Sequence, residues 1–277
     1  MNRQFFRASL GALPFCLSAV CVAAAPQYAV VDLGSATVAG AGLAWQTHIP
    51  YSQLAPAGWP AAGGSSCYGN PPKNFLGAEF GNVAVGATCL QDGGEEAAKW
   101  TLSGGTVTLT ALGALPGANN GGGIDFPFAY AWDFNTLGDI VGQSTSRYPV
   151  PVQPSRSYAR HGFIYNNGNW TELIPIAGVN YESTAEGIND SREVVGQTET
   201  ISSTTGEVLD RAFVYINGTM YNLTFYLVGG PTVLLSDAHG IDCQGNIAAT
   251  GTPASGGGTQ HNYLLLRQGA APTNCPK

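Results

Sequence analysis

The side chains in this sequence that are best suited to chemistry are three carboxylates and one imidazole in repeated segments. They are Asp133, Glu186, Asp237 and His239. A pair of carboxylates is what cleavage of a glycosidic bond requires, and an aspartate near a histidine can orient that histidine as a base. The same residues also suit the turns or the solvated surface of a structural repeat, since aligned positions in different copies carry different residues. We name these four as candidate catalytic residues and leave both interpretations open.

Three further polar residues share one position immediately before a turn in successive copies. They are Asn135, Asn189 and Asp242. Asn and Asp side chains hydrogen-bond to the backbone two residues on, so this position predicts capped Asx turns rather than catalysis. The sequence contains no Gly-x-Ser-x-Gly, His-Glu-x-x-His, phosphate-binding loop or calcium-binding loop. We therefore predict no cofactor and no metal site, and we expect no catalytic activity.

Aromatic side chains are the candidate binding residues, because their faces can stack on sugar rings. The candidates are Trp132, Tyr148, Tyr158 and Tyr181. The same residues also fit ordinary packing, and their positions in space are needed to decide between the two roles.

These residues are positioned by a unit of four short strands that recurs along the chain. Its clearest copy runs from Ala185 to Leu223, and Gly142 and Gly196 end the second strand of two copies 54 residues apart. The apolar runs are short, rich in β-branched and aromatic residues, and separated by Gly, Asn, Asp, Ser or Pro, which predicts strands. Asn167-Gly168 and Asn217-Gly218 predict tight type I′ hairpins. The repeat units span about 74–113, 128–174, 182–224 and 235–267.

Four-stranded units joined by tight hairpins at this spacing predict an all-β fold, a β-propeller of four antiparallel blades. The last unit contains only three strands, whereas residues 28–34 have the pattern of a strand with nothing before it. We predict that this N-terminal strand completes the last blade and closes the ring, which removes two sheet edges. Residues 46–73 are predicted to be an irregular insertion, with a degenerate fifth blade as the alternative. The single propeller-like domain spans residues 26–277.

Residues 1–25 have the pattern of a secretory leader (a signal peptide) that is cleaved around residues 23–25. Arg3 and Arg7 precede an apolar stretch that ends in three alanines. That stretch is too short for a membrane span and no second long apolar run follows, so we expect a secreted or periplasmic protein. A formal net charge of −7 and only 10% charged residues argue against nucleic acid and anionic membranes as partners. We expect a monomer.

Four cysteines remain outside the predicted leader: Cys67, Cys89, Cys243 and Cys275. An even number in an exported protein predicts two disulfides. In a blade, Cys243 and Cys275 fall on the face of the short turns, whereas Cys67 and Cys89 fall on the opposite face. We therefore predict the pairs Cys67–Cys89 and Cys243–Cys275. A metal site is the rival interpretation, but no Cys-x-x-Cys spacing supports it.

The clearest copy resembles a known type of repeat. The run from Ala185 to Gly196, followed by Arg211-Ala212-Phe213, is similar to the HAF-type extracellular repeat, which is named for a His-Ala-Phe third strand. His161-Gly162-Phe163 is a near variant, whereas Ala97-Ala98-Lys99 and Asn262-Tyr263-Leu264 depart from the pattern. Two copies thus match well and two are degenerate. The resemblance implies an exported repeat protein with no established biochemical activity, and it carries no catalytic residues over.

Loop lengths provide the remaining functional signal. Turns on one face of the predicted blades are minimal, whereas connections on the other face, such as residues 113–128, 144–159 and 197–210, are long and dissimilar. Irregular loops on a rigid scaffold are where binding sites usually lie. We therefore expect an exported, non-catalytic binding module whose long-loop face takes a protein, glycan or cell-surface ligand. The alternatives are a secreted glycan-cleaving hydrolase with carboxylates in a central channel, and a purely structural role in the envelope.

Overall fold

The computed structural model describes residues 25–35, 49–50, 75–89, 94–118, 128–149, 158–255, 258–269 and 272. Within these residues the fold is all-β, and the only helical element is a short 3-10 turn, η2 (Leu223–Tyr226). None of the helical structure in this part of the chain is long and apolar enough to cross a membrane. The predicted leader lies outside the described residues.

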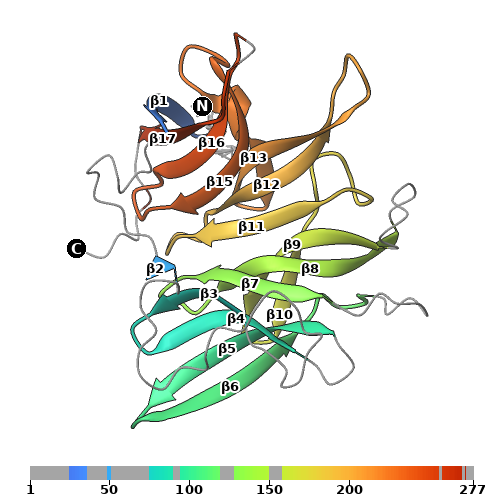
Figure 1. Cartoon of the computed structure of the whole chain (residues 1–277), viewed down its shortest axis with the longest axis vertical. Coiled ribbons are helices and arrows are strands. Elements are labelled where there is room, and N and C mark those ends of the chain that lie inside the picture. The colour runs from blue at the N-terminus through green and yellow to red at the C-terminus, as the bar shows by residue number, and fades with distance from the viewer. Residues whose placement is uncertain are drawn as a thin grey trace, which may run out of the picture.

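The strands form four antiparallel sheets that follow one another along the chain (Figure 1). The first sheet contains β2 (Ile49–Pro50), β3 (Phe75–Phe80), β4 (Val83–Cys89), β5 (Glu95–Ser103) and β6 (Thr106–Gly113). The second contains β7 (Ala129–Phe134), β8 (Ile140–Pro149), β9 (Tyr158–Asn166) and β10 (Asn169–Leu173). The third contains β11 (Ser183–Ile188), β12 (Val194–Ile201), β13 (Val208–Ile216) and β14 (Thr219–Asn222). The fourth contains β15 (Val233–Ile241), β16 (Ile247–Pro253), β17 (His261–Gln268) and β1 (Gln27–Gly34).

The prediction of an all-β chain built from antiparallel four-stranded sheets is confirmed. Neighbours in each sheet are neighbours in sequence, with one exception: β1 joins the fourth sheet beside β17. The first sheet has a fifth strand, β2, which lies in the segment predicted to be an irregular insertion and adds two residues beside β3.

Tight turns form where the Asn-Gly pairs predict them. Asn167 and Gly168 have φ values of 46° and 87°, and Asn217 and Gly218 have values of 50° and 86°. A type I′ turn requires positive φ at both central residues, and its twist matches that of the flanking strands. These turns join β9 to β10 and β13 to β14.

The glycine that recurs in the second strand has a packing cause. A Cβ atom at Gly142 would overlap the carbonyl oxygen of Tyr130 in β7, and one at Gly196 would overlap that of Thr184 in β11. In the second sheet β7 and β8 therefore approach each other too closely for a side chain at Gly142, and in the third sheet the same holds for β11 and β12 at Gly196. This close approach explains why Val-Gly recurs in the repeat.

The fourth sheet is completed by the N-terminal strand. Strand β1 runs antiparallel to β17, with Val30 opposite Leu265 and Val31 opposite Leu264. Tyr28 in β1 is fully buried in the core shared by the third and fourth sheets. The first and last described strands of the chain are thus paired, as the sequence predicts. This pairing completes the fourth sheet but does not by itself bring the first sheet against the fourth.

The four sheets pack in a row (Figure 1). One core cluster of buried residues joins the first sheet to the second, another joins the second to the third, and the largest joins the third to the fourth. Among the described residues no core cluster joins the fourth sheet to the first. The predicted closure of the blades into a ring is therefore not found, because β1 completes its own sheet without bringing the first sheet against the fourth.

The cysteine predictions fall mostly on residues that the structure does not describe. Cys243, in the turn after β15, is disulfide-bonded. Cys67 and Cys275 lie outside the described residues, and only the backbone of Cys89 is described, at the end of β4. The pairs Cys67–Cys89 and Cys243–Cys275 therefore stay predictions.

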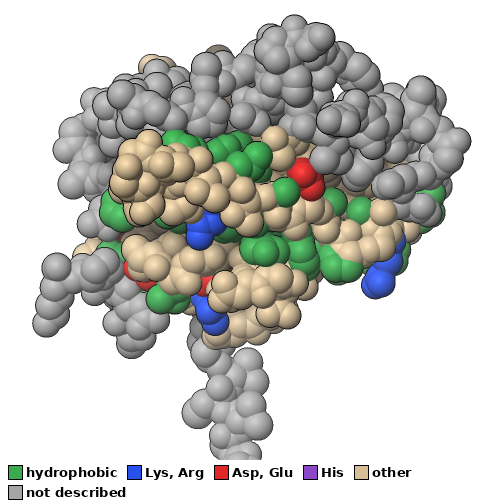
Figure 2. All heavy atoms as spheres, turned by 90° about the horizontal axis from the view of Figure 1, so that it is seen from below, with side chains coloured by type: hydrophobic (Ala, Val, Ile, Leu, Met, Phe, Trp, Pro, Cys, Tyr) green, Lys and Arg blue, Asp and Glu red, His purple; other side chains and the backbone are tan. Residues whose placement is uncertain are grey.

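The end of the molecule formed by the first sheet carries few charged side chains. Figure 2 shows hydrophobic and uncharged polar groups intermixed over the described surface there, with isolated Lys, Arg, Asp or Glu side chains. This agrees with a chain in which only 10% of residues are charged. Long-range electrostatic attraction is weak at a surface with so few charges.

Candidate functional site

We call the strand that pairs with the second strand of each repeat unit and precedes it in the chain the leading strand: β3, β7, β11 and β15. Successive leading strands lie side by side. Each contains a β-bulge at a corresponding position, where its register with the second strand skips one residue. The residues skipped at that position, which we call the bulge row, are Gly77, Trp132, Glu186 and His239; β15 has a second shift, at Ser236, that is not part of this row. A bulge bends its strand and re-aims the extra side chain, which is why bulges are common beside active sites.

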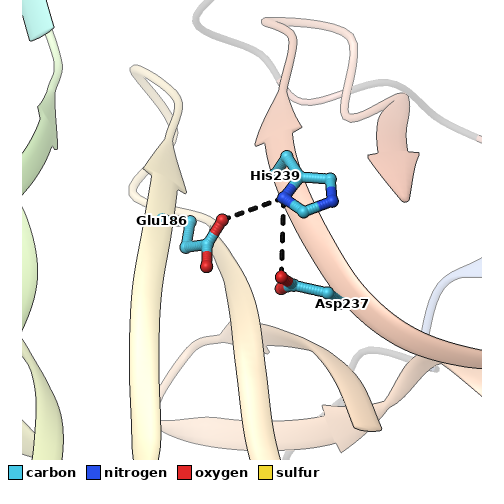
Figure 3. A group of neighbouring side chains, drawn as sticks. All are labelled: Glu186, Asp237 and His239. Carbon is cyan, nitrogen blue, oxygen red and sulfur yellow. Dashed lines mark hydrogen bonds and ion pairs between the residues drawn. The ribbon is translucent and has the colours of Figure 1, made fainter. Parts of the chain in front are cut away.

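Two members of the bulge row meet between the third and fourth sheets, where they form a cluster with Asp237 (Figure 3). The His239 Nδ1 atom lies 3.0 Å from Glu186 Oε2 and 3.5 Å from Asp237 Oδ2. Glu186 comes from β11, whereas Asp237 and His239 lie two residues apart on β15. The structure thus brings together three of the four candidate catalytic residues, from two different repeat units.

The three side chains are held in place by their neighbours. The backbone N–H of Ala238 donates a hydrogen bond of 2.8 Å to Asp237 Oδ1, which leaves Oδ2 directed toward the imidazole. On the other side of the ring, His239 Nε2 lies 3.3 Å from the Thr250 hydroxyl oxygen. Thr250 is the cross-strand partner of Asp237. Sequence reasoning did not identify Thr250, because its place depends on the strand register.

Burial and mutual charge change the acidity of this cluster. Burial, together with repulsion by the Glu186 carboxylate, raises the pKa of Asp237 to about 7, although His239 opposes the shift. The hydrogen bond to Glu186 and attraction to both carboxylates raise the pKa of His239 against the opposing effect of burial. Near neutral pH Asp237 is therefore present in both its protonated and its ionised form, and the neighbouring His239 imidazole favours its charged form.

The fourth candidate, Asp133, forms a hydrogen bond between two sheets and is not part of the Glu186 cluster. Its Oδ2 accepts a hydrogen bond of 3.0 Å from the backbone N–H of Ile188, which ties the second sheet to the third. The neighbouring bulge residue Trp132 is 40% exposed and stacks against Tyr130 at a ring-centroid distance of 4.3 Å and a tilt of 35°. An exposed aromatic face therefore stands in the same row as the Glu186 cluster.

The other aromatic candidates lie elsewhere. The Tyr148 ring lies 5.8 Å from the His161 ring, and the carbonyl oxygen of Tyr181 lies 3.0 Å from His161 Nε2. Tyr158 begins strand β9 and is half-buried. Tyr148 and Tyr181 thus share the buried His161 as a neighbour, and none of the contacts described for these three tyrosines reaches Trp132.

The residues predicted to cap turns do so, and they also link the sheets. Asn135 Oδ1 accepts hydrogen bonds from the backbone of Leu137 and Asp139, and Asn189 Oδ1 accepts them from the turn that follows it. In addition, the Asn135 amide donates to the carbonyl of Asn189, and the Asn189 amide donates to that of Asp242. The Asx turns are confirmed at Asn135 and Asn189, whereas Asp242 Oδ1 accepts from the backbone N–H of Asn246, four residues on. The hydrogen bonds between neighbouring sheets are a feature that sequence reasoning missed.

No protein-family model matches this chain, and no curated protein is significantly similar to it. The bulge row is therefore the feature of the molecule that bears on function. The cluster of Glu186, Asp237 and His239 can exchange protons, form hydrogen bonds and bind a cation, and Trp132 can stack on an aromatic or sugar ring.

Proposed function

We propose that the chain is an exported, non-catalytic binding module and that the bulge row is its ligand-binding surface. The observation that carries the proposal is the repeated bulge. The backbone device recurs in all four sheets, while the side chain that it presents changes from Gly to Trp, Glu and His. A scaffold that fixes the position and varies the chemistry is suited to recognising a ligand with several different groups.

A glycan is the ligand class that this surface fits best. The partly exposed Trp132 offers an aromatic face for a sugar ring, and Glu186 offers a carboxylate that accepts hydrogen bonds from hydroxyl groups. The long-loop face expected from the sequence stays a second proposed surface. Of its connections, residues 202–207 between β12 and β13 are fully described, whereas much of the others is not.

The alternative, a glycan-cleaving hydrolase, has less geometric support. Glycosidases separate their two carboxyl groups by about 5–5.5 Å when they retain configuration and by about 6.5–9.5 Å when they invert it. The ligand atoms of Glu186, Asp237 and His239 all lie within 4.8 Å of one another, and the imidazole contacts both carboxylates. The two carboxyl groups thus lie closer together than in either class of glycosidase, and both are already engaged by the imidazole.

Binding and cleavage are separated by a glycan array combined with a polysaccharide-cleavage screen. We expect retention without turnover, and we expect Trp132→Ala to weaken retention about tenfold through loss of stacking. The matched control is Phe225→Ala, which removes an aromatic side chain that is 70% exposed and lies in η2, an element that contains no member of the bulge row. Equal retention by both variants would remove Trp132 from the binding surface. Cleavage that is abolished by Glu186→Gln or Asp237→Asn would establish the hydrolase instead.

A further inference from the structure

The Glu186 cluster contains the ligand types and spacings of a metal site. Two carboxylate oxygens and one imidazole nitrogen converge from two sheets, and each residue supplies one ligand atom. Imidazole with carboxylates suits zinc and related first-row metals, whereas calcium and magnesium prefer oxygen ligands alone. The set therefore favours a transition-metal dication.

The distances agree with that interpretation. Zinc binds nitrogen and oxygen at about 2.0–2.2 Å, so two ligands of a tetrahedral site lie about 3.4 Å from each other. His239 Nδ1 is 3.0 Å from the Glu186 oxygen and 3.5 Å from the Asp237 oxygen. Two of the three distances between ligand atoms are thus close to those of a tetrahedral site, and all three ligand atoms lie within 4.8 Å of one another.

The surroundings also fit. A metal-binding histidine commonly has a hydrogen-bond partner at its other ring nitrogen, and Thr250 Oγ1 occupies that place at 3.3 Å from Nε2. The side chains of His239, Glu186 and Asp237 are 48%, 25% and 19% exposed, so an ion can enter from the imidazole side. Solvent or a ligand group would take the fourth position.

We propose that Glu186, Asp237 and His239 bind one first-row transition-metal dication, with zinc as the expected occupant. This departs from the prediction of no metal site, which was made from cysteine spacing and sequence motifs and could not place Glu186 beside His239. The inference does not depend on the glycan ligand. A chain that binds zinc but no glycan, or glycan but no zinc, would support one proposal and remove the other.

The test uses the full chain, purified without a polyhistidine tag, kept oxidised so that the disulfide of Cys243 stays intact, and freed of metal by chelation. Binding of Zn²⁺ is measured by competition with a chromophoric chelator, and Co²⁺ is added as a spectroscopic probe of tetrahedral ligation. We expect one equivalent to bind. Because loss of a second-shell partner alone costs about 10–100-fold in affinity, we expect His239→Ala and Glu186→Gln each to cost at least tenfold.

The matched control is His261→Ala. His261 Nδ1 also lies 3.0 Å from a carboxylate, that of Asp32, but this pair has no third ligand in the described part of the chain. Wild-type affinity in His261→Ala, together with loss in His239→Ala and Glu186→Gln, supports the site. The proposal is wrong if the wild-type chain binds no more Zn²⁺ than the triple variant of Glu186, Asp237 and His239, or if His239→Ala keeps full affinity. Circular dichroism spectra of all variants confirm that each one folds.

Discussion

At the scale of single residues, the repeat contains positions whose side chains differ between units and positions where close backbone packing requires glycine. In the bulge row, β7, β11 and β15 carry Trp, Glu and His, whereas a Cβ at Gly77 would overlap the carbonyl oxygen of Ala131, so packing against β7 requires glycine there. Gly142 and Gly196 accept no side chain, because a Cβ would overlap a carbonyl oxygen of the leading strand. The bulge therefore presents a different side chain in each of the last three sheets, whereas Gly77, Gly142 and Gly196 are required by the close approach of a neighbouring backbone.

A buried carboxylate in the turn network makes stability depend on pH. Asp139 is 2% exposed; burial tends to raise its pKa, but hydrogen bonds from Asn135, Arg192 and Asn166 outweigh that effect and hold the pKa below its ordinary value. A pKa that is lower in the folded state adds stability above the unfolded pKa, and that stability is lost as the pH falls through the folded pKa. We therefore expect the wild-type free energy of unfolding to fall between pH 6 and pH 3, and to fall less in Asp139→Asn.

Urea denaturation at the two pH values measures this effect. The control is Glu207→Gln, which removes an exposed carboxylate in the β12–β13 loop. An equal loss of stability in Asp139→Asn and wild type would show that other groups dominate the acid response.

The candidate site shows what could be predicted at this scale. Glu186, Asp237 and His239 were each recognisable as reactive types, and the repeat placed Glu186 and His239 at corresponding positions of neighbouring units. Their contact over 53 residues, however, depends on two bulges and on the packing of β11 against β15. Those are non-local features that residue types and spacing do not determine, and the same is true of Thr250.

At the scale of strands and turns, the turns could be predicted from their own residues, whereas the hydrogen bonds by which the same residues link neighbouring sheets could not. The Asn-Gly hairpins and the Asx turns follow from the conformational preferences of their own residues. The same asparagines also donate across sheets, from Asn135 to Asn189 at a separation of 54 residues and from Asn189 to Asp242 at 53. These bonds repeat at the period of the sequence, so they fix the position of each unit relative to the next.

The turn after β11 allows this series to be tested. Asn189→Ala removes the cap on Ser191 and Glu193 and leaves the carbonyl of Asp242 without its donor from the third sheet. Loss of a cap and of a buried hydrogen bond together should lower the free energy of unfolding by about 2–3 kcal/mol, as measured by chemical denaturation.

The control lies in the same turn. Ser191 Oγ is buried and finds no hydrogen-bond partner among the described residues. Ser191→Ala removes a polar atom that gains nothing in the fold, so we expect a change within about 0.5 kcal/mol or a slight stabilisation. A large loss in Ser191→Ala, or no loss in Asn189→Ala, would contradict the role given to the asparagine.

At the scale of the whole molecule, four sheets are joined by three core clusters. Each sheet packs on its neighbours in sequence, and the described residues provide no cluster between the first sheet and the fourth. Stability in such a row is approximately the sum of each unit and its interfaces, so a local defect stays near its origin. The sheets and the pairing of β1 were predictable from strand patterns, whereas ring closure depends on how successive sheets turn relative to one another, which no pattern encodes.

Deletion of residues 26–34 distinguishes a row from a ring. The deletion exposes the edge of β17, removes Tyr28 from the core between the third and fourth sheets, and should lower stability and promote association through the free edge. In a row, we expect amide hydrogen exchange to lose protection mainly in β15–β17 and in the third sheet, while β4, β5 and β8 stay protected. The control, Val31→Ala, keeps the strand and shortens a side chain that is 38% exposed, so its protection pattern should match that of wild type. Equal loss of protection in the first and fourth sheets of the deletion variant would show that the two sheets are coupled directly, as a closed ring requires.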